Sequence, residues 1–189
     1  MARVLFEEDR SPTGQDAYLL RIASMAMGLK GVPDTKLGVF ANLDPEVRFG
    51  ISYRGKPFFI VQWWMAPGAI LPAHRHPRAS VCTVGVEGET RLRHFEALPD
   101  APEYNSGSKA TFLMRQTRDQ ILTPGRVSTL SSSRDNIHYF HAGPAGARGI
   151  DITTGYGGGG SFSFIQFDPD KPADRNKGLY EAVWIGSKL

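Results

Sequence analysis

The chain has 189 residues, 41% of them hydrophobic and 22% charged, which is ordinary for a globular protein and enough for one hydrophobic core. The net charge of +3 comes from basic residues scattered among acidic ones, which argues against a nucleic-acid-binding surface. A single cysteine, Cys82, excludes an internal disulfide. No apolar run is long enough to span a membrane, and the acidic residues Glu7, Glu8 and Asp9 do not fit a signal peptide, so we expect a cytoplasmic protein.

The N-terminal part, residues 1–31, is expected to be an extension that contains one helix. Apolar residues recur at helical spacing between Asp16 and Lys30. Asp16 is a suitable N-cap for this helix, and Gly31 is a suitable residue to end it. Residues 32–57 are mixed in character and contain several turn signals.

Short strands are predicted through the rest of the chain. Residues 58–65 are apolar and aromatic, which indicates a buried strand with Trp63 and Trp64 on opposite faces. Residues 90–95 alternate in polarity and are expected to pair back through a turn at Gly88. The further strand candidates are residues 110–114, 121–123, 127–130, 137–141, 147–153, 161–167 and 182–185. Many short strands separated by turn signals predict an all-β barrel or sandwich.

Two histidines stand two residues apart at His74 and His76, between glycines at Gly68 and Gly88. Side chains alternate along an extended segment, so the two imidazoles leave the same face. Two imidazoles on one face are suited to bind a metal ion. This segment is therefore the strongest candidate for a functional site in the chain.

A further strand is expected after the turn at residues 131–136, and it carries two more histidines. In that strand, His138 and Phe140 share one face, and Tyr139 and His141 share the other. His138 is therefore the better ligand and His141 the poorer one. His94 lies in a polar stretch, where we expect a surface role.

The glycine, the His-x-His pair and the following strand resemble the first metal motif of the cupins. Most metal-binding cupins carry a glutamate four or five residues past the second histidine, and here those positions hold Ser80 and Val81. Three neutral imidazoles without a carboxylate would suit zinc, and they leave an iron site one unit more positive than the usual set of two histidines and a carboxylate. Such a site favours an anionic ligand from the substrate, and a thiolate meets this need.

Within the cupins, the sequence resembles the thiol dioxygenases, specifically the branch of 2-aminoethanethiol dioxygenase and the plant cysteine oxidases. Three stretches carry the resemblance, at residues 67–77, 133–138 and 149–156. The resemblance covers about residues 58–167 and implies that residues 1–189 form a single cupin domain, a double-stranded β-helix or jelly-roll barrel, with its metal site in that core.

The resemblance implies that His74, His76 and His138 hold Fe(II), and that a substrate thiol is oxidised to a sulfinic acid with both atoms of O2. It makes Asp151 and Tyr156 candidates for contacts with the substrate or with the ligands. The apolar candidates for a substrate pocket are Phe140, Ile152 and Phe164. The Tyr156 segment is one residue shorter than the family pattern, so the substrate is left open between cysteamine, cysteine and a peptide with an N-terminal cysteine.

Two other classes of function remain open. One is another cupin metalloenzyme, such as a ring-cleaving oxygenase or an isomerase, and the other is a non-enzymatic cupin that binds a small ligand. The expected partners are a small thiol or an N-terminal-cysteine peptide and O2, without nucleic acid or membrane, in a monomer or homodimer. Cys82 stands in an apolar strand and is expected to be a packing residue.

Overall fold

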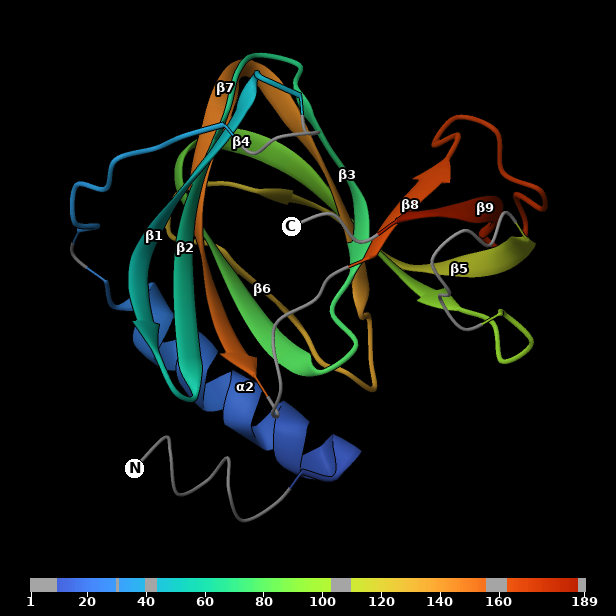
Figure 1. The fold of residues 1–189 in the computed structure, drawn as a ribbon, viewed down its shortest axis with the longest axis horizontal. Helices are drawn as coiled ribbons and strands as arrows, with labels where there is room; N and C mark the ends of the chain where they lie inside the picture. Colours follow the sequence, from blue (N-terminus) through green and yellow to red (C-terminus); the bar gives the residue numbers. More distant parts are fainter. Residues whose placement is uncertain (1–9, 30, 40–43, 103–109, 156–162, 187–189) are drawn as a thin grey trace.

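The computed structural model describes residues 10–29, 31–39, 44–102, 110–155 and 163–186, which form one helix and nine strands (Figure 1). The helix is α2 (Pro12–Met27). The strands are β1 (Val47–Gly55), β2 (Phe58–Met65), β3 (Ile70–Arg75), β4 (Ala79–Ala97), β5 (Thr111–Leu122), β6 (Val127–Leu130), β7 (Ile137–Gly155), β8 (Ser163–Phe167) and β9 (Leu179–Gly186). In the part of the chain that the structure describes, no helix is long and apolar enough to cross a membrane.

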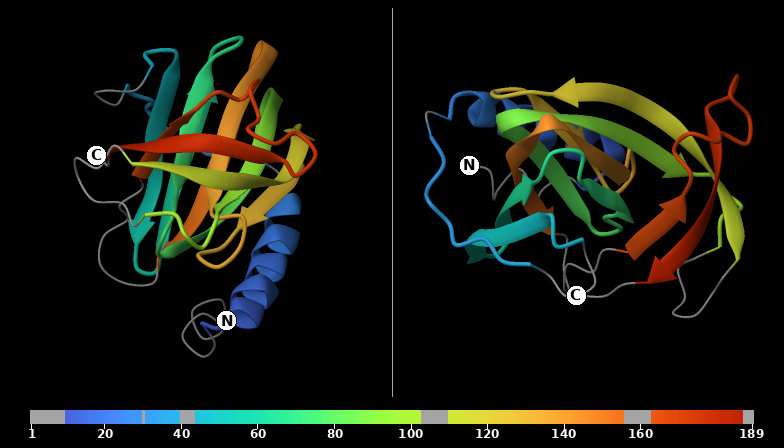
Figure 2. Two further views of the ribbon diagram at one scale, coloured as in Figure 1. Left: turned by 90° about the vertical axis from the view of Figure 1, so that its right-hand side faces the viewer. Right: turned by 90° about the horizontal axis from the view of Figure 1, so that it is seen from above.

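The nine strands form one antiparallel sheet that closes on itself. The strand order is β1-β2-β7-β3-β8-β9-β5-β4-β6, and β7 also pairs with β4. This additional pairing joins β7, β3, β8, β9, β5 and β4 into a ring, while β1, β2 and β6 flank it. Figures 1 and 2 show a barrel-like body, which contains β1, β2, β3, β4, β6 and β7, beside the group of β5, β8 and β9. Helix α2 lies along one side of this body. A closed ring leaves its own strands without free edges for pairing with another chain.

Strands β4 and β7 are 19 residues long each and pair along most of their lengths. The hairpin expected at Gly88 was wrong, because β4 runs through this residue with irregular register on either side of it. Gly88 and Gly146 both have positive φ, at 63° and 77°, and a Cβ on Gly88 would collide with the Gly146 carbonyl oxygen. Glycine at position 88 therefore permits a close approach of two bent strands and does not form a turn.

The interior of the body is lined by one apolar cluster, and a second cluster lies beneath β5, β8 and β9. The first consists of Val47, Trp63, Met65, Ala69, Leu71, Leu92, Leu122, Phe140, Ala142, Ala147 and Phe164. The second consists of Ala73, Phe95, Phe112, Met114, Ile137, Tyr139, Ile165, Ala182 and Trp184. Adjacent residues of β7 enter different cores, since Phe140 belongs to the first and Tyr139 to the second. On β3, Leu71 belongs to the first core and Ala73 to the second, because the register shifts between Leu71 and His74.

Helix α2 starts four residues earlier than expected and ends before Gly28. Ser11 caps it by accepting a hydrogen bond from the Gly14 N–H at 3.1 Å, and Pro12 occupies the first turn. A serine followed by proline is a strong start signal, because serine satisfies a free N–H and proline needs none. Asp16 thus lies inside the helix and is available for another contact.

The inner face of α2 packs against the outer face of β4. Tyr18, Leu19 and Ile22 form an apolar cluster with Cys82 and Val84. Since Cys82 is fully buried there, the structure places it as a packing residue.

Several of the observed strands are longer than those predicted. The bounds of β2 and β6 match the prediction, and Trp63 is buried while Trp64 is half-buried. The candidates at 110–114 and 121–123 are parts of the single strand β5, and those at 137–141 and 147–153 are parts of β7. No strand was predicted at β1, whose burial pattern is irregular because it lies at the end of the sheet. Residues 161 and 162 of the predicted strand 161–167 lie outside the described residues.

Candidate metal centre

Three histidines from β3, the turn after it, and the start of β7 converge in the interior. His74 and His138 are directly opposed across the β3–β7 pair, and His76 follows the end of β3. The Nε2 atom of His138 lies 2.7 Å from Nε2 of His74 and 3.0 Å from Nε2 of His76. All three ligand atoms lie within 4.8 Å of one another, so this group could bind a metal ion.

The donor set fits a divalent cation. His74 Nδ1–H donates to the Pro72 carbonyl at 2.8 Å, which leaves the lone pair on Nε2, the atom that faces the other two rings. Burial lowers the pKa of His74 to about 4. Burial, followed by the other histidines, also holds the pKa values of His76 and His138 well below the ordinary value. At neutral pH the three rings are therefore uncharged, the form that coordinates metals.

The described residues contribute no carboxylate to this group. Val81, at one of the two positions where most metal cupins carry glutamate, is fully buried on β4. Its neighbour Cys82 packs against α2, so Val81 faces inward together with Thr83. The break between β3 and β4 at Pro77–Arg78 resets the alternation that the His-x-His pair began. The inward position thus holds an apolar residue.

His94 is buried in the interior, and the surface role expected for it was wrong. Its side chain is 1% exposed, and it is directly opposed to His138 across the β4–β7 pair. His94 Nδ1–H donates to the Asp135 carbonyl at 3.2 Å, so Nε2 accepts from the Ser128 hydroxyl at 2.8 Å. Both ring nitrogens of His94 are therefore hydrogen-bonded, so neither has a lone pair available to bind a metal ion. Its period-two spacing from the apolar Leu92 was the signal for an inward position.

Asp151 lies in the interior but one layer away from the histidines. Its carboxylate accepts hydrogen bonds from Thr83 and from Trp63 Nε1, the latter at 3.4 Å. Desolvation raises the pKa of Asp151 to about 6, against the effect of these hydrogen bonds. Trp63 packs on Phe140, and Phe140 packs on His138, with ring centroids 5.4 and 4.7 Å apart. The other candidate from this segment, Tyr156, lies outside the described residues.

Two of the three apolar pocket candidates contact the histidines. Phe140 stacks on His74 with ring centroids 6.3 Å apart, and Phe164 lies 5.8 Å from the same ring. Ile152 does not contact the group, because it points to the outer face of β7 and packs against the α2 cluster. Adjacent residues of a strand face opposite sides, so Ile152 lies on the side of β7 opposite to Asp151, and its role in a substrate pocket stays a prediction.

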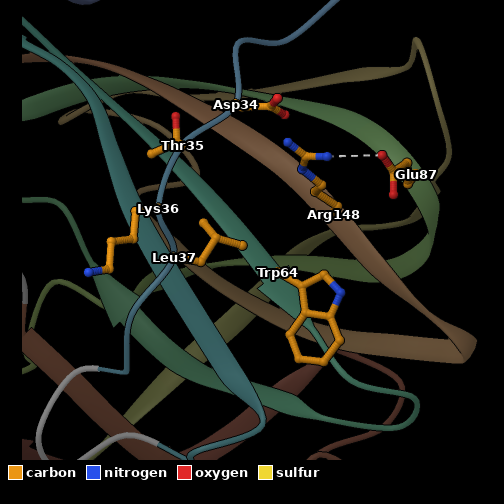
Figure 3. A pocket seen from close by; sticks show the side chains of 7 residues that line it. All are labelled: Asp34, Thr35, Lys36, Leu37, Trp64, Glu87 and Arg148. Carbon is orange, nitrogen blue, oxygen red and sulfur yellow. Dashed lines mark hydrogen bonds and ion pairs between the residues drawn. The ribbon is translucent and has the colours of Figure 1, made fainter.

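A separate pocket of about 500 Å³ lies where residues 34–37 cross β2. Figure 3 shows the indole of Trp64 and the side chain of Leu37 beside charged groups. Arg148 donates to Glu87 at 3.0 Å and to Gln62 at 2.9 Å. None of the lining residues belongs to the histidine group, so this pocket is separate from the candidate metal centre.

The sequence matches no protein-family model and no curated protein. Solved structures with a similar fold include pumpkin seed globulin, with a TM-score of 0.50 and 12% identity over 70% of this chain and 32% of the globulin. A recombinant oxalate oxidase in complex with glycolate has a TM-score of 0.49 and 18% identity over 73% of this chain and 67% of the oxidase. A Klebsiella pneumoniae protein with a double-stranded β-helix domain has a TM-score of 0.46 and 14% identity, over 67% and 95% of the two chains.

Identities this low show the fold alone, and of these three structures only the globulin reaches a TM-score of 0.50. The closed antiparallel ring of strands and the single helix at its side agree with that likeness. The prediction of an all-β barrel with a short N-terminal helix is confirmed.

Proposed function

We propose that this protein is a metal-dependent oxygenase of thiols, with Fe(II) as its metal. One observation carries the proposal: three uncharged imidazoles converge without a carboxylate among the described residues of the group. The resemblance of three sequence stretches to thiol dioxygenases supports the same choice. His74, His76 and His138 would hold the ion, which would supply the redox chemistry with O2.

Charge favours an anionic substrate at such a site. Three neutral ligands leave the full charge of a divalent cation in a buried place, and an anion relieves this cost. A thiolate provides the anion, because a coordinating thiol gives up its proton. Thiolate and O2 combine to form a sulfinate, and the sulfur supplies all the electrons that reduce O2. The reaction therefore needs no additional reductant.

The protein's own residues would orient the ligands and exclude water. The hydrogen bond from His74 to the Pro72 carbonyl fixes which nitrogen of the ring faces the site. Phe140 and Phe164 flank the His74 ring and give the site an apolar wall. An apolar wall suits a small thiol and keeps the reacting sulfur away from bulk water. Asp151 lies behind Trp63 and would influence the site only through that aromatic layer.

The competing proposal is another cupin metalloenzyme that acts on an oxygen anion, since a cationic site without a carboxylate also accepts carboxylates. Oxygen uptake by the Fe(II)-loaded protein separates the two. The panel contains cysteamine, cysteine, a peptide with an N-terminal cysteine, and glycolate as a carboxylate without sulfur. We expect uptake with at least one thiol and a product heavier by two oxygen atoms.

The matched control is His141→Ala, because this exposed histidine lies on the same strand as His138 but outside the group. It should retain the thiol-dependent uptake, whereas His76→Ala should lose it. Tight iron binding with uptake only on glycolate would favour the competing enzyme. Absence of bound metal in protein purified without a histidine tag would favour the ligand-binding cupin.

A further inference from the structure

The turn before β7 contains the only non-glycine residue with positive φ among the described residues, Asp135, at 55°. The left-handed region is unfavourable for a residue with a Cβ, although aspartate tolerates it better than most. Residues held in such conformations persist only where surrounding contacts determine them, and they gather at functional sites. Asp135 precedes the candidate ligand His138 by three residues.

Four neighbouring groups hold Asp135. Its carboxylate Oδ2 accepts from Arg134 at 2.6 Å and from Arg118 at 3.0 Å. Its backbone N–H donates to Glu96 Oε1 at 3.0 Å, and its carbonyl accepts from His94 Nδ1 at 3.2 Å. Its side chain is 7% exposed, so the two ion pairs are shielded from solvent on this side. The backbone N–H, the backbone carbonyl and the carboxylate Oδ2 of Asp135 therefore all have hydrogen-bond partners.

The same turn is attached to helix α2. Arg134 donates from Nε and from Nη2 to Asp16 Oδ1, both at 2.9 Å. Gln15, one residue earlier on the helix, accepts from the backbone N–H and the hydroxyl of Ser132 at 3.2 and 3.0 Å. Arg134 thus bridges Asp16 on the helix to Asp135 in the turn.

The turn also connects to two of the three histidines. The His76 N–H donates to the Asn136 carbonyl at 3.0 Å, and the Asn136 side chain donates to the Ser132 carbonyl at 3.0 Å. His138 Nδ1 is buried and has no hydrogen-bond partner among the described residues. A metal-ligating histidine is usually oriented by a hydrogen bond from its second nitrogen. For His138 that orientation must come from its backbone position and its packing on Phe140 and His94.

We propose that Asp135 and the Asp16–Arg134 ion pair are positioning elements for the metal centre, through which helix α2 sets the affinity of the histidine group for its ion. The proposal rests on the proposed function only in that the three histidines bind a metal. Asp135 fixes the backbone that carries His138, and Asn136 in the same turn fixes the backbone of His76. The helix would therefore act on the ion without contacting any ligand.

The experiment measures the affinity of the full chain for Co(II) by competition with a chelator, together with the visible absorption of bound Co(II). Asp135→Asn removes the ion pairs but keeps a residue that tolerates positive φ, and Asp135→Gly removes the side chain while favouring that conformation. Each should weaken Co(II) binding about 10–100-fold, the range found when groups that support a metal ligand are removed. The Co(II) spectrum should change as well, which a general loss of stability would not cause.

Asp16→Asn should weaken binding less, about threefold to tenfold, since Arg118 still holds Asp135. Arg134→Gln breaks both links, so adding Asp16→Asn to it should have no further effect on affinity. The matched control is Asp119→Asn, which removes an equally short arginine pair, that with Arg91, on the exposed side of β4 and β5. It should leave the affinity and the spectrum unchanged.

Equal Co(II) affinity and spectrum in the wild type, the Asp135 variants and Asp16→Asn would overturn the proposal, whatever the enzyme acts on. Independent effects of Asp16→Asn and Arg134→Gln would overturn the bridging role of Arg134. Failure of the wild type to oxidise thiols, with Co(II) binding still dependent on Asp135, would overturn the proposed function and support this inference. Absence of Co(II) binding by the wild type would overturn both.

Discussion

The two halves of strand β7 line the same interior but carry opposite chemistry. The first half presents His138, which meets two other imidazoles, and the second half presents Asp151, which meets an indole and a hydroxyl. Burial depresses the pKa of the histidine and raises that of the aspartate. Both halves therefore favour the uncharged form, and desolvation, more than ion pairing, determines their protonation.

An aromatic layer separates the two halves. Phe140 contacts His138 on one side and Trp63 on the other, and Trp63 donates to Asp151. The carboxylate behind this layer does not belong to the group of ligand atoms that the three histidines form. One strand thus carries both a histidine of the candidate metal centre and a buried carboxylate, but the two do not form the usual ligand set of two histidines and one carboxylate.

The strongest test of this difference is to remove each of the two residues in turn and to measure metal binding. His138→Ala should abolish stoichiometric binding of Fe(II) or Co(II), because it removes one of the three donors that the described residues bring together. Asp151→Asn should retain the ion at full stoichiometry, because the aromatic layer lies between. Metal analysis of both variants, with His141→Ala as the control, checks this. Loss of the ion in Asp151→Asn would show that the two halves form one site.

Strand parity made the histidine group predictable from the sequence. The two-residue period pairs His74 with His76 and His138 with Phe140, and the resemblance to cupins indicates that the strand of His138 supplies the third ligand. The charged neighbours of His94, among them Arg91 and Arg93, make its stretch polar in the sequence, and this composition obscures its inward position. Successive side chains of a strand face opposite sides, so a strand with a polar outer face can still bury its inner face.

The long-range features could not be predicted in the same way. Gly88 signals a turn in sequence, but its conformation depends on the close approach of Gly146, 58 residues later. The turn at Asp135 is held by Glu96, Arg118 and helix α2, which no local pattern brings together. Tertiary contacts decided these features, and local propensity was only one contribution.

The next largest expected effect is on the free energy of unfolding, and it comes from Phe140 in the aromatic layer. Phe140→Ala removes a fully buried ring that contacts His74, His138 and Trp63. We expect a loss of about 3–5 kcal/mol in the free energy of unfolding, from lost burial and the cavity left behind. Chemical denaturation of the metal-free protein measures it. Tyr53→Ala, at a ring that is 50% exposed, is the control and should cost much less. A similar loss in both would contradict a packed layer at Phe140.

The pH dependence of stability should differ in sign between Asp151 and an exposed carboxylate. The folded-state pKa of Asp151 is raised to about 6, so the protonated form is favoured in the fold. Its ionisation therefore lowers stability as the pH rises from about 4 through 6. Asp151→Asn should gain up to about 3 kcal/mol relative to the wild type between pH 4 and pH 8. Urea unfolding at the two pH values gives this difference directly.

Asp119 provides the opposite case. A hydrogen bond from Arg91 holds the pKa of its carboxyl below the ordinary value, so its contribution to stability is present at neutral pH and is lost as the pH falls. Asp119→Asn should therefore lose stability relative to the wild type as the pH rises from about 2 to about 5, by less than about 1 kcal/mol for a partly exposed pair. The same sign for both variants would mean that Asp151 is paired or solvated.

A small effect on stability and none on the metal centre are expected at Cys82, on the outer side of the same β4–β7 pair. Its thiol is buried against helix α2, and burial raises its pKa to about 12, so the reactive thiolate is absent at neutral pH. Cys82→Ala should cost about 1 kcal/mol of stability, typical of a small core truncation, and leave metal affinity unchanged. Native protein should also resist a thiol-modifying reagent until it unfolds. Rapid modification of the native protein would contradict the burial of the thiol. Weaker metal binding in Cys82→Ala would show that the outer face of the β4–β7 pair is coupled to the interior that holds His138.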